Sequence, residues 1–261
     1  MRLKAFYVMT PAGKAPESEK RVVRGALLSG AWILLLLNLA AYALAHWLTL
    51  GMLFFFKTLS VYLFIFMVML TQLTDHRPSS KFGSANQITL VRAGLVALLC
   101  GFIGESLSHL LLWYAVMIGL LGTMLDGVDG WLARREGLVS RMGARFDMEI
   151  DALHILILSV LAFQSNKAGV WVLTAGALRY LFLVVGYFIP WLASELAPSR
   201  RRQSVCVIQI VSLIVCLSPA IPAPWSGWIA ASGVILLIAS FLIDSWHLAR
   251  SHYQKSLRRM T

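Results

Sequence analysis

Charged residues are scarce in this chain. Asp, Glu, Lys and Arg make up 13% of the 261 residues, whereas 59% are hydrophobic. A water-soluble domain carries about twice that share of charge. Cysteine is scarce as well: Cys100, Cys206 and Cys216 all lie within apolar runs and lack metal-ligand spacing, which excludes a disulfide framework and favours buried apolar roles. The composition therefore predicts a protein whose solvent is lipid.

Apolar runs long enough to cross a bilayer follow one another along the chain. A spanning helix needs about 20 apolar residues, because its backbone polar groups must be bonded within the segment. We predict an all-α, polytopic transmembrane helix bundle with eight spans. The first run follows about 25 residues without a cleavage signal, so we expect a retained span rather than a signal peptide. The expected spans are 27–50, 52–73, 88–107, 109–132, 147–164, 169–192, 205–220 and 227–248.

Basic residues gather on one side of these spans. Nineteen of the 23 Lys and Arg residues lie at the two ends of the chain and in alternate loops, whereas Lys167 alone lies in a loop on the other side. Cytoplasmic loops collect Lys and Arg, so we expect a multi-pass protein of a bacterial inner membrane with both termini in the cytoplasm. The formal charge of +11 then requires no nucleic acid, because these residues can face anionic membrane lipids.

A polar interruption within residues 74–87 divides the chain. The hairpin before it carries almost no reactive side chains, and we assign it a packing or partner role. We expect a basic cytoplasmic N-terminus at 1–25, a transmembrane hairpin and linker at 26–83, a six-span core at 84–252, and a basic tail at 253–261.

Four carboxylates stand where a bilayer disfavours them. Asp126 and Asp129 lie near the end of the fourth run, and Asp147 and Asp151 open the fifth. Spacings of three and four residues place each pair on one helix face, and the short turn between the runs lets the two pairs meet at one depth. A carboxylate within a span costs about 2.5–3.5 kcal/mol, so acids in spans usually pair, bind ions or do chemistry.

Four converging negative charges need cations or protons nearby. Oxygen ligands favour Mg²⁺, Mn²⁺ or Ca²⁺ over zinc, and four carboxylates suit the two-metal clusters that serve phosphoryl transfer. Small residues accompany the acids at helical spacing, which leaves room for a bulky ligand or for close helix packing. They are Gly130, Ala133 and Gly143. The alternative for the acids is ion pairing with Arg134, Arg135 and Arg145.

Residues 126–151 read DGVDGWLARREGLVSRMGARFDMEID and fit the pattern D-x2-D-G-x2-A-R-x8-G-x3-D-x3-D at every fixed position. This pattern resembles that of the CDP-alcohol phosphotransferase (phosphatidyltransferase) family. Upstream, Asn86, Thr89 and Arg92 resemble the Asn, Thr and Arg that members often carry where the membrane core begins, although Ala85 stands where many have proline.

The resemblance implies a reaction and a site. Asp126, Asp129 and Asp147 would be metal ligands for Mg²⁺ or Mn²⁺, with two ions expected, and Asp151 would be the base and a further ligand. Asp151 would take the proton of an alcohol that attacks the β-phosphorus of a CDP-linked lipid, CDP-diacylglycerol, which releases CMP in phospholipid biosynthesis. A homodimer is also plausible by resemblance. The residues expected to bind the nucleotide are Gly130, Ala133, Arg134, Gly143, Asn86 and Thr89.

Three arginines are candidates for binding phosphate or the acceptor. Arg179 lies near the middle of the sixth run, where a guanidinium can hold phosphate oxygens bidentately, although a structural pair with an acid is the alternative. Arg92 would border the donor's phosphates or reach lipid phosphates instead. Arg145 could attract an anionic acceptor or belong to the ordinary cytoplasmic flank.

Two rival functions share the acids. A membrane prenyltransferase would also bind Mg²⁺ and a diphosphate, but its Asp-rich motifs stand far apart in the chain. A divalent-cation transporter, which is not an enzyme, would explain the acids but not the small residues and Arg134. The acceptor alcohol stays open, and so does the question whether the CDP carries the lipid or the head group.

Overall fold

The computed structural model describes residues 17–73, 82–136, 141–189, 191 and 199–257. These ranges contain α-helices and short 3-10 segments and no strand, which confirms the predicted all-α fold. The α-helices are α1 (Glu17–Trp47), α2 (Met52–Gln72), α3 (Ser84–Gly101), α4 (His109–Glu136), α5 (Arg141–Gln164), α6 (Leu173–Phe188), α7 (Arg200–Leu217) and α8 (Trp225–Leu257). A 3-10 helix, Val170–Val172, precedes α6.

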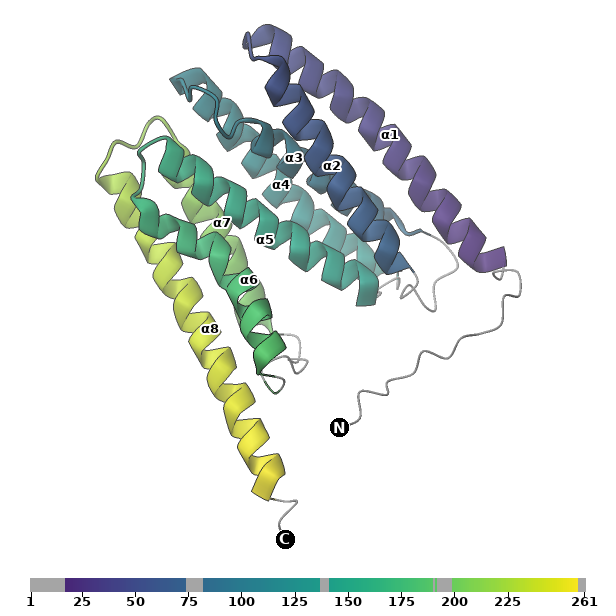
Figure 1. Ribbon diagram of the computed structural model, residues 1–261, viewed down its shortest axis with the longest axis vertical. Coiled ribbons are helices and arrows are strands. Elements are labelled where there is room, and N and C mark those ends of the chain that lie inside the picture. Colours follow the sequence, from purple (N-terminus) through teal and green to yellow (C-terminus); the bar gives the residue numbers. More distant parts are fainter. Residues whose placement is uncertain (1–16, 74–81, 137–140, 190, 192–198, 258–261) are drawn as a thin grey trace.

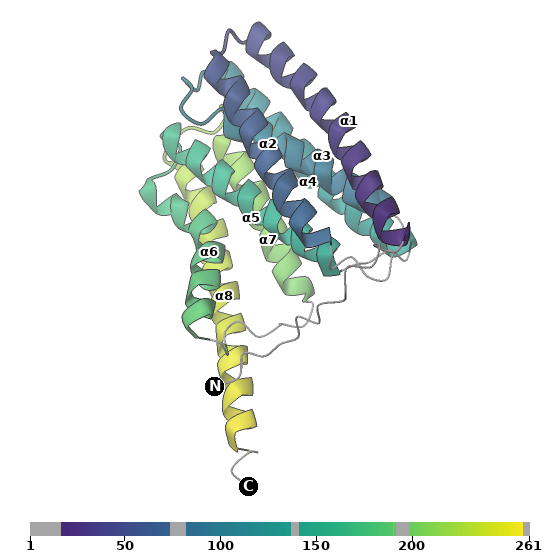
Figure 2. The ribbon, with the colours of Figure 1, turned by 45° about the vertical axis from the view of Figure 1, so that its right-hand side comes forward.

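The helices lie side by side in a bundle (Figures 1 and 2). Helices α1 and α2 form one flank of this bundle and α6 and α8 the opposite flank. Consecutive helices run in opposite directions, so the first turn of α1 and the last turn of α8 point toward the same end. Which end faces the cytoplasm stays a prediction from the basic residues.

Six helical segments of the described chain are long and apolar enough to cross a membrane: α1 to α4, a segment at 170–188 that contains α6, and α8. Helices α5 and α7 differ because of their charges. The first half of α5 carries Asp147, Glu149 and Asp151, and α7 begins with three arginines. Both nevertheless pack within the bundle, α5 against α3, α6 and α7, and α7 against α4, α5 and α8. Each of the eight predicted runs thus overlaps one of the eight described α-helices, and six of these are long and apolar enough to cross a membrane.

Helix α3 is the central element of the half of the bundle that carries the acids. Of its spanning segment 61% is buried within the protein, compared with 17% for α1. It packs against α1 and α2 on one side and against α4 and α5 on the other. Helix α3 begins after Gly83, so Asn86 and Thr89 lie inside the helix rather than at its cap.

The N-terminal hairpin is tied to the core by polar bonds at the end of the bundle opposite to the acids. Lys57 of α2 donates to the carbonyl oxygen of Ile103 and lies 3.0 Å from Oε1 of Glu105. The side chain of Gln164, at the end of α5, accepts from the Gly104 amide at 2.8 Å and donates to the Glu105 carbonyl at 2.7 Å. Gly104 has φ +84°, a left-handed conformation that favours glycine. These bonds join α2, the α3–α4 turn and α5 into one unit.

Candidate active site at an acidic cluster

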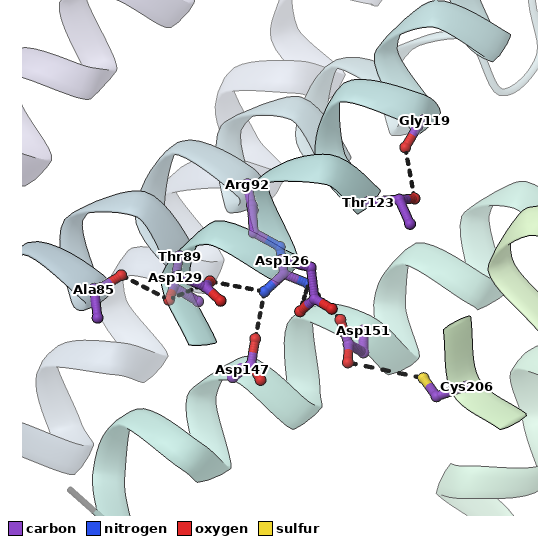
Figure 3. Close-up of polar contacts among 10 residues, drawn as sticks. All are labelled: Ala85, Thr89, Arg92, Gly119, Thr123, Asp126, Asp129, Asp147, Asp151 and Cys206. Atoms are coloured by element: carbon purple, nitrogen blue, oxygen red, sulfur yellow. Dashed lines mark hydrogen bonds and ion pairs between the residues drawn. The ribbon is translucent and has the colours of Figure 1, made fainter. Parts of the chain in front are cut away.

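The four aspartates meet between α4 and α5, as their spacing predicts. Oxygen atoms of Asp126, Asp129 and Asp147 lie within 4.8 Å of one another. Asp151 joins them one helical turn beyond Asp147 and shares an arginine partner with all three. We define these four side chains as the acidic cluster (Figure 3).

Arg92 of α3 occupies the centre of the acidic cluster. Its side chain is 1% exposed. Nη1 lies 3.0 Å from Oδ2 of Asp129 and also contacts Oδ1 of Asp147, whereas Nη2 lies 2.8 Å from Oδ1 of Asp126 and contacts Oδ1 of Asp151. Each terminal nitrogen therefore joins one acid of α4 to one acid of α5 (Figure 3). Sequence reasoning treated Arg92 as a phosphate ligand and missed this pairing, because no spacing rule relates α3 to the motif.

Thr89 lies one turn before Arg92 and reaches the same acid. Its hydroxyl oxygen is 3.1 Å from Oδ2 of Asp129 and 3.0 Å from the carbonyl oxygen of Ala85. A hydroxyl has one proton, so it donates to one of these oxygens at a time. Asn86 is buried on the same helix. The expected nucleotide-binding roles of Thr89 and Asn86 stay predictions.

The acidic cluster is open at one side. The side chain of Asp147 is 38% exposed, that of Asp126 21%, that of Asp151 17% and that of Asp129 7%. A Cβ atom built on Gly127, next to Asp126, would meet nothing within 4 Å. A polar ligand can therefore approach the cluster from the side of Asp147 and Asp126.

The donor set fits a hard divalent cation. Among the described side chains of the cluster, four carboxylates face one guanidinium, which leaves an excess of three negative charges at full ionisation. Mg²⁺ or Ca²⁺ bonds oxygen at roughly 2.0–2.6 Å, so two ligand atoms of one ion stand at most about 5 Å apart. The spacing within 4.8 Å among Asp126, Asp129 and Asp147 meets this condition without rearrangement.

Two further residues, Cys206 and His154, lie near Asp151. The thiol of Cys206 on α7 donates to its Oδ2 at 3.7 Å. His154, one turn deeper on α5, is 2% exposed, and its Nε2 has no hydrogen-bond partner among the described residues. The His154 ring lies against α4, where its Cε1 would be 3.3 Å from a Cβ atom at Gly122. The sequence predicts only a buried apolar role for Cys206, because a single cysteine within an apolar run gives no sign of a carboxylate partner.

The remaining residues of the motif lie in α4 and α5, the two helices that carry the acids. Gly130 lies in α4 and Gly143 in the first turn of α5. Ala133 and Arg134 also lie in α4, but their side chains fall outside the described part of the chain. Arg145 is exposed on α5. Their expected roles toward the nucleotide or the acceptor stay predictions.

Arg179 of α6 pairs with Glu149 of α5. Its Nε lies 3.4 Å from Oε2 of Glu149, and its Nη2 contacts Oε1. Nη1 lies 3.1 Å from the sulfur of Met148. A guanidinium held in this way joins α5 to α6, which is the kind of structural pairing that stood as the alternative to phosphate binding.

Comparison with known proteins supplies the family. A family model described as CDP-alcohol phosphatidyltransferase matches residues 82–243. Comparison with curated proteins and with solved structures gave no match. The matched region covers more than half of the chain, extends from the start of α3 into α8, and contains the whole acidic cluster together with Arg92. The chain therefore belongs to the CDP-alcohol phosphatidyltransferase family.

Proposed function

We propose that the protein transfers a phosphatidyl-type group from CDP-diacylglycerol to an alcohol acceptor and releases CMP, in a reaction that depends on divalent metal. Membership of a family of transferases that use CDP-alcohols supports the reaction class. The acidic cluster carries the proposal, because it gathers oxygen ligands and an excess of negative charge at one place. A site of this kind suits a metal-bound diphosphate.

Asp126, Asp129 and Asp147 would hold the metal, Mg²⁺ or Mn²⁺, with two ions expected. When bound, the metal would neutralise the donor's diphosphate and stabilise negative charge on the departing CMP. The open side of the cluster, near Asp147 and Asp126, is the side from which we expect the diphosphate to enter.

Asp151 would act as the general base. Its carboxylate accepts the proton of the acceptor hydroxyl while the hydroxyl oxygen forms a bond to the β-phosphorus. The bond from that phosphorus to the oxygen of CMP breaks, and CMP leaves with the electron pair. Cys206, which donates to Oδ2 of Asp151, and Arg92, which donates to Oδ1, would orient this carboxylate.

Recognition of the donor's nucleotide belongs to the same proposal. Thr89 of α3 contacts Asp129, and we propose that it binds the nucleotide together with Asn86 on the same helix, Gly130 on α4 and Gly143 on α5. Arg179 would bind a phosphorylated acceptor only after leaving Glu149, so its pairing weakens our expectation of a phosphate there. The panel of candidate acceptors therefore includes neutral alcohols as well as phosphorylated ones.

The test is CMP release by purified protein in lipid nanodiscs with CDP-diacylglycerol, Mg²⁺ or Mn²⁺ and a panel of alcohols. We expect metal-dependent CMP matched by a new phospholipid, and at least a hundredfold loss in Asp151→Asn. Asp244→Asn is the matched control, because Asp244 of α8 pairs with Arg201 of α7 and is not one of the four acids of the cluster. It should keep most of the activity.

Two further arms test which group the CDP carries and whether the protein transports cations instead. CDP-alcohols offered together with diacylglycerol test whether the CDP carries the head group instead of the lipid. If no pairing of donor and acceptor releases CMP in a metal-dependent way, and Mn²⁺ enters liposomes that contain the protein, the transferase is rejected and the cation transporter is favoured.

The location in a bacterial inner membrane, with the site in the cytoplasm, is tested by fusions at the C-terminus. A fluorescent-protein fusion should be fluorescent, and a fusion to a phosphatase that needs the periplasm should be inactive.

A further inference from the structure

The contacts of Arg92 form a bridge between two helices. Its Nη1 binds Asp129 of α4 and Asp147 of α5, and its Nη2 binds Asp126 of α4 and Asp151 of α5. The planar fork of a guanidinium can direct two nitrogens at two pairs of carboxylates, which the single ammonium of a lysine cannot do. Because Arg92 lies on α3, a third helix, its side chain joins α3 to the acid-bearing parts of α4 and α5.

The charge of Arg92 also acts on any cation that enters the acidic cluster. The guanidinium offsets one of the four negative charges, and it occupies one oxygen of each carboxylate. A divalent ion bound by these carboxylates would therefore stand a few ångströms from a fixed positive charge in a poorly hydrated site. Like charges at such a distance repel strongly. The burial of Arg92, whose side chain is 1% exposed, limits how far water screens this repulsion.

We propose that Arg92 is a resident counter-ion of the acidic cluster, a positioning residue that assembles the four acids without metal and at the same time weakens metal binding. The inference rests on the proposed metal role of the cluster. It assigns to Arg92 a function toward the acids in place of the phosphate contact expected from the sequence. It also explains how four carboxylates can persist close together in a membrane when no ion is bound: one fixed cation relieves part of their repulsion, and the remaining negative charge still attracts metal.

The proposal is tested by measuring metal affinity and metal-free stability separately. Arg92→Gln removes the charge and keeps a shorter polar side chain, whereas Arg92→Lys keeps the charge and loses the fork. Mn²⁺ binding, followed by the loss of the free-ion electron paramagnetic resonance signal, gives the affinity. Thermal unfolding in detergent with a chelator gives the metal-free stability. Neither measurement requires substrate or turnover.

We expect Arg92→Gln to unfold at a lower temperature than wild type without metal, to bind Mn²⁺ at least tenfold more tightly, and to recover most of the lost melting temperature when Mn²⁺ is added. Arg92→Lys should also melt lower without metal, but its Mn²⁺ affinity should stay within about threefold of wild type. A residue with a purely structural role would lower metal affinity when replaced. Weaker Mn²⁺ binding by folded Arg92→Gln, or an unchanged metal-free melting temperature, would overturn the proposal.

Misfolding of Arg92→Gln does not end the test. Preparation in Mn²⁺ throughout should yield folded protein, and unfolding on addition of a chelator would support the role of Arg92 as the cation that replaces metal. If Arg92→Gln misfolds with Mn²⁺ as well, Arg92→Lys becomes the deciding variant. A metal-free melting temperature of Arg92→Lys equal to that of wild type would refute the claim that the fork of Arg92 joins α4 to α5. Mn²⁺ binding without any CMP release would reject the proposed reaction and leave this inference standing, whereas absence of Mn²⁺ binding by wild type and variants would reject the inference.

Discussion

Neutralising one acid of the cluster should stabilise the metal-free protein. Asp147 is the most exposed of the four acids, and its Oδ1 accepts a hydrogen bond from Arg92. In Asp147→Asn the side-chain oxygen can still accept that bond, while the negative charge disappears. The substitution therefore removes repulsion from the neighbouring acids and keeps the polar contact.

The magnitude follows from the charges and their separation. The oxygens of Asp126 and Asp129 lie within 4.8 Å of that of Asp147, and unit charges at this upper limit repel by about 3–4 kcal/mol at an effective dielectric constant near 20, so the two repulsions together reach roughly 7 kcal/mol. Attraction to Arg92 at contact distance offsets about 5–6 kcal/mol of this. Repulsion from Asp151 adds to the surplus, and the 38% exposure of Asp147 screens every one of these interactions. The net stabilisation in Asp147→Asn is about 1 kcal/mol, or a few degrees in melting temperature.

The assay is thermal unfolding of detergent-solubilised protein with a chelator, followed by the fluorescence of the nine tryptophans. Asp244→Asn makes the same chemical change at the Arg201–Asp244 pair, where one carboxylate meets one guanidinium among the described residues. That variant should melt lower than wild type, because it leaves Arg201 without its ionic partner. Addition of Mn²⁺ should raise the melting temperature of wild type more than that of Asp147→Asn, since the variant has lost a ligand. The reasoning is wrong if Asp147→Asn destabilises the metal-free protein as Asp244→Asn does.

Three further predictions concern the base and the packing. Asp151→Asn should abolish phospholipid formation yet melt within a few degrees of wild type; a large loss of melting temperature would instead make it a structural residue. Gly176→Ala should lower stability by roughly 1–3 kcal/mol in thermal unfolding, because a Cβ atom there would lie 2.5 Å from Cα of Leu156, whereas Gly51→Ala, with nothing within 4 Å, should change little. Lys57→Met should lower stability by about 1–3 kcal/mol and speed proteolysis of the hairpin, since two of its bonds to the α3–α4 turn are lost; unchanged proteolysis would show that apolar packing alone holds the hairpin.

Much of the fold could be predicted from the sequence, because the hydrophobic effect and backbone hydrogen bonding act on each segment separately. Long apolar runs predicted all eight helices, and the largest boundary error falls at α1, which begins at Glu17 although its apolar run begins near residue 27. That first stretch is polar, so hydrophobicity gave no signal for the helix. The same reason explains why α5 begins at Arg141 and α7 at Arg200, five to six residues before their apolar runs.

The sequence by itself determined which residues form the acidic cluster. Spacings of three and four within one helix place side chains on one face wherever the helix lies, and the short connection between α4 and α5 brings the two faces together. The tertiary structure alone decided what the cluster contacts. Arg92 stands 37 residues before Asp129, and Cys206 stands 55 residues after Asp151. Both reach the cluster because α3 and α7 pack against α4 and α5, and such packing depends on the fit of whole helix surfaces, which no local spacing records.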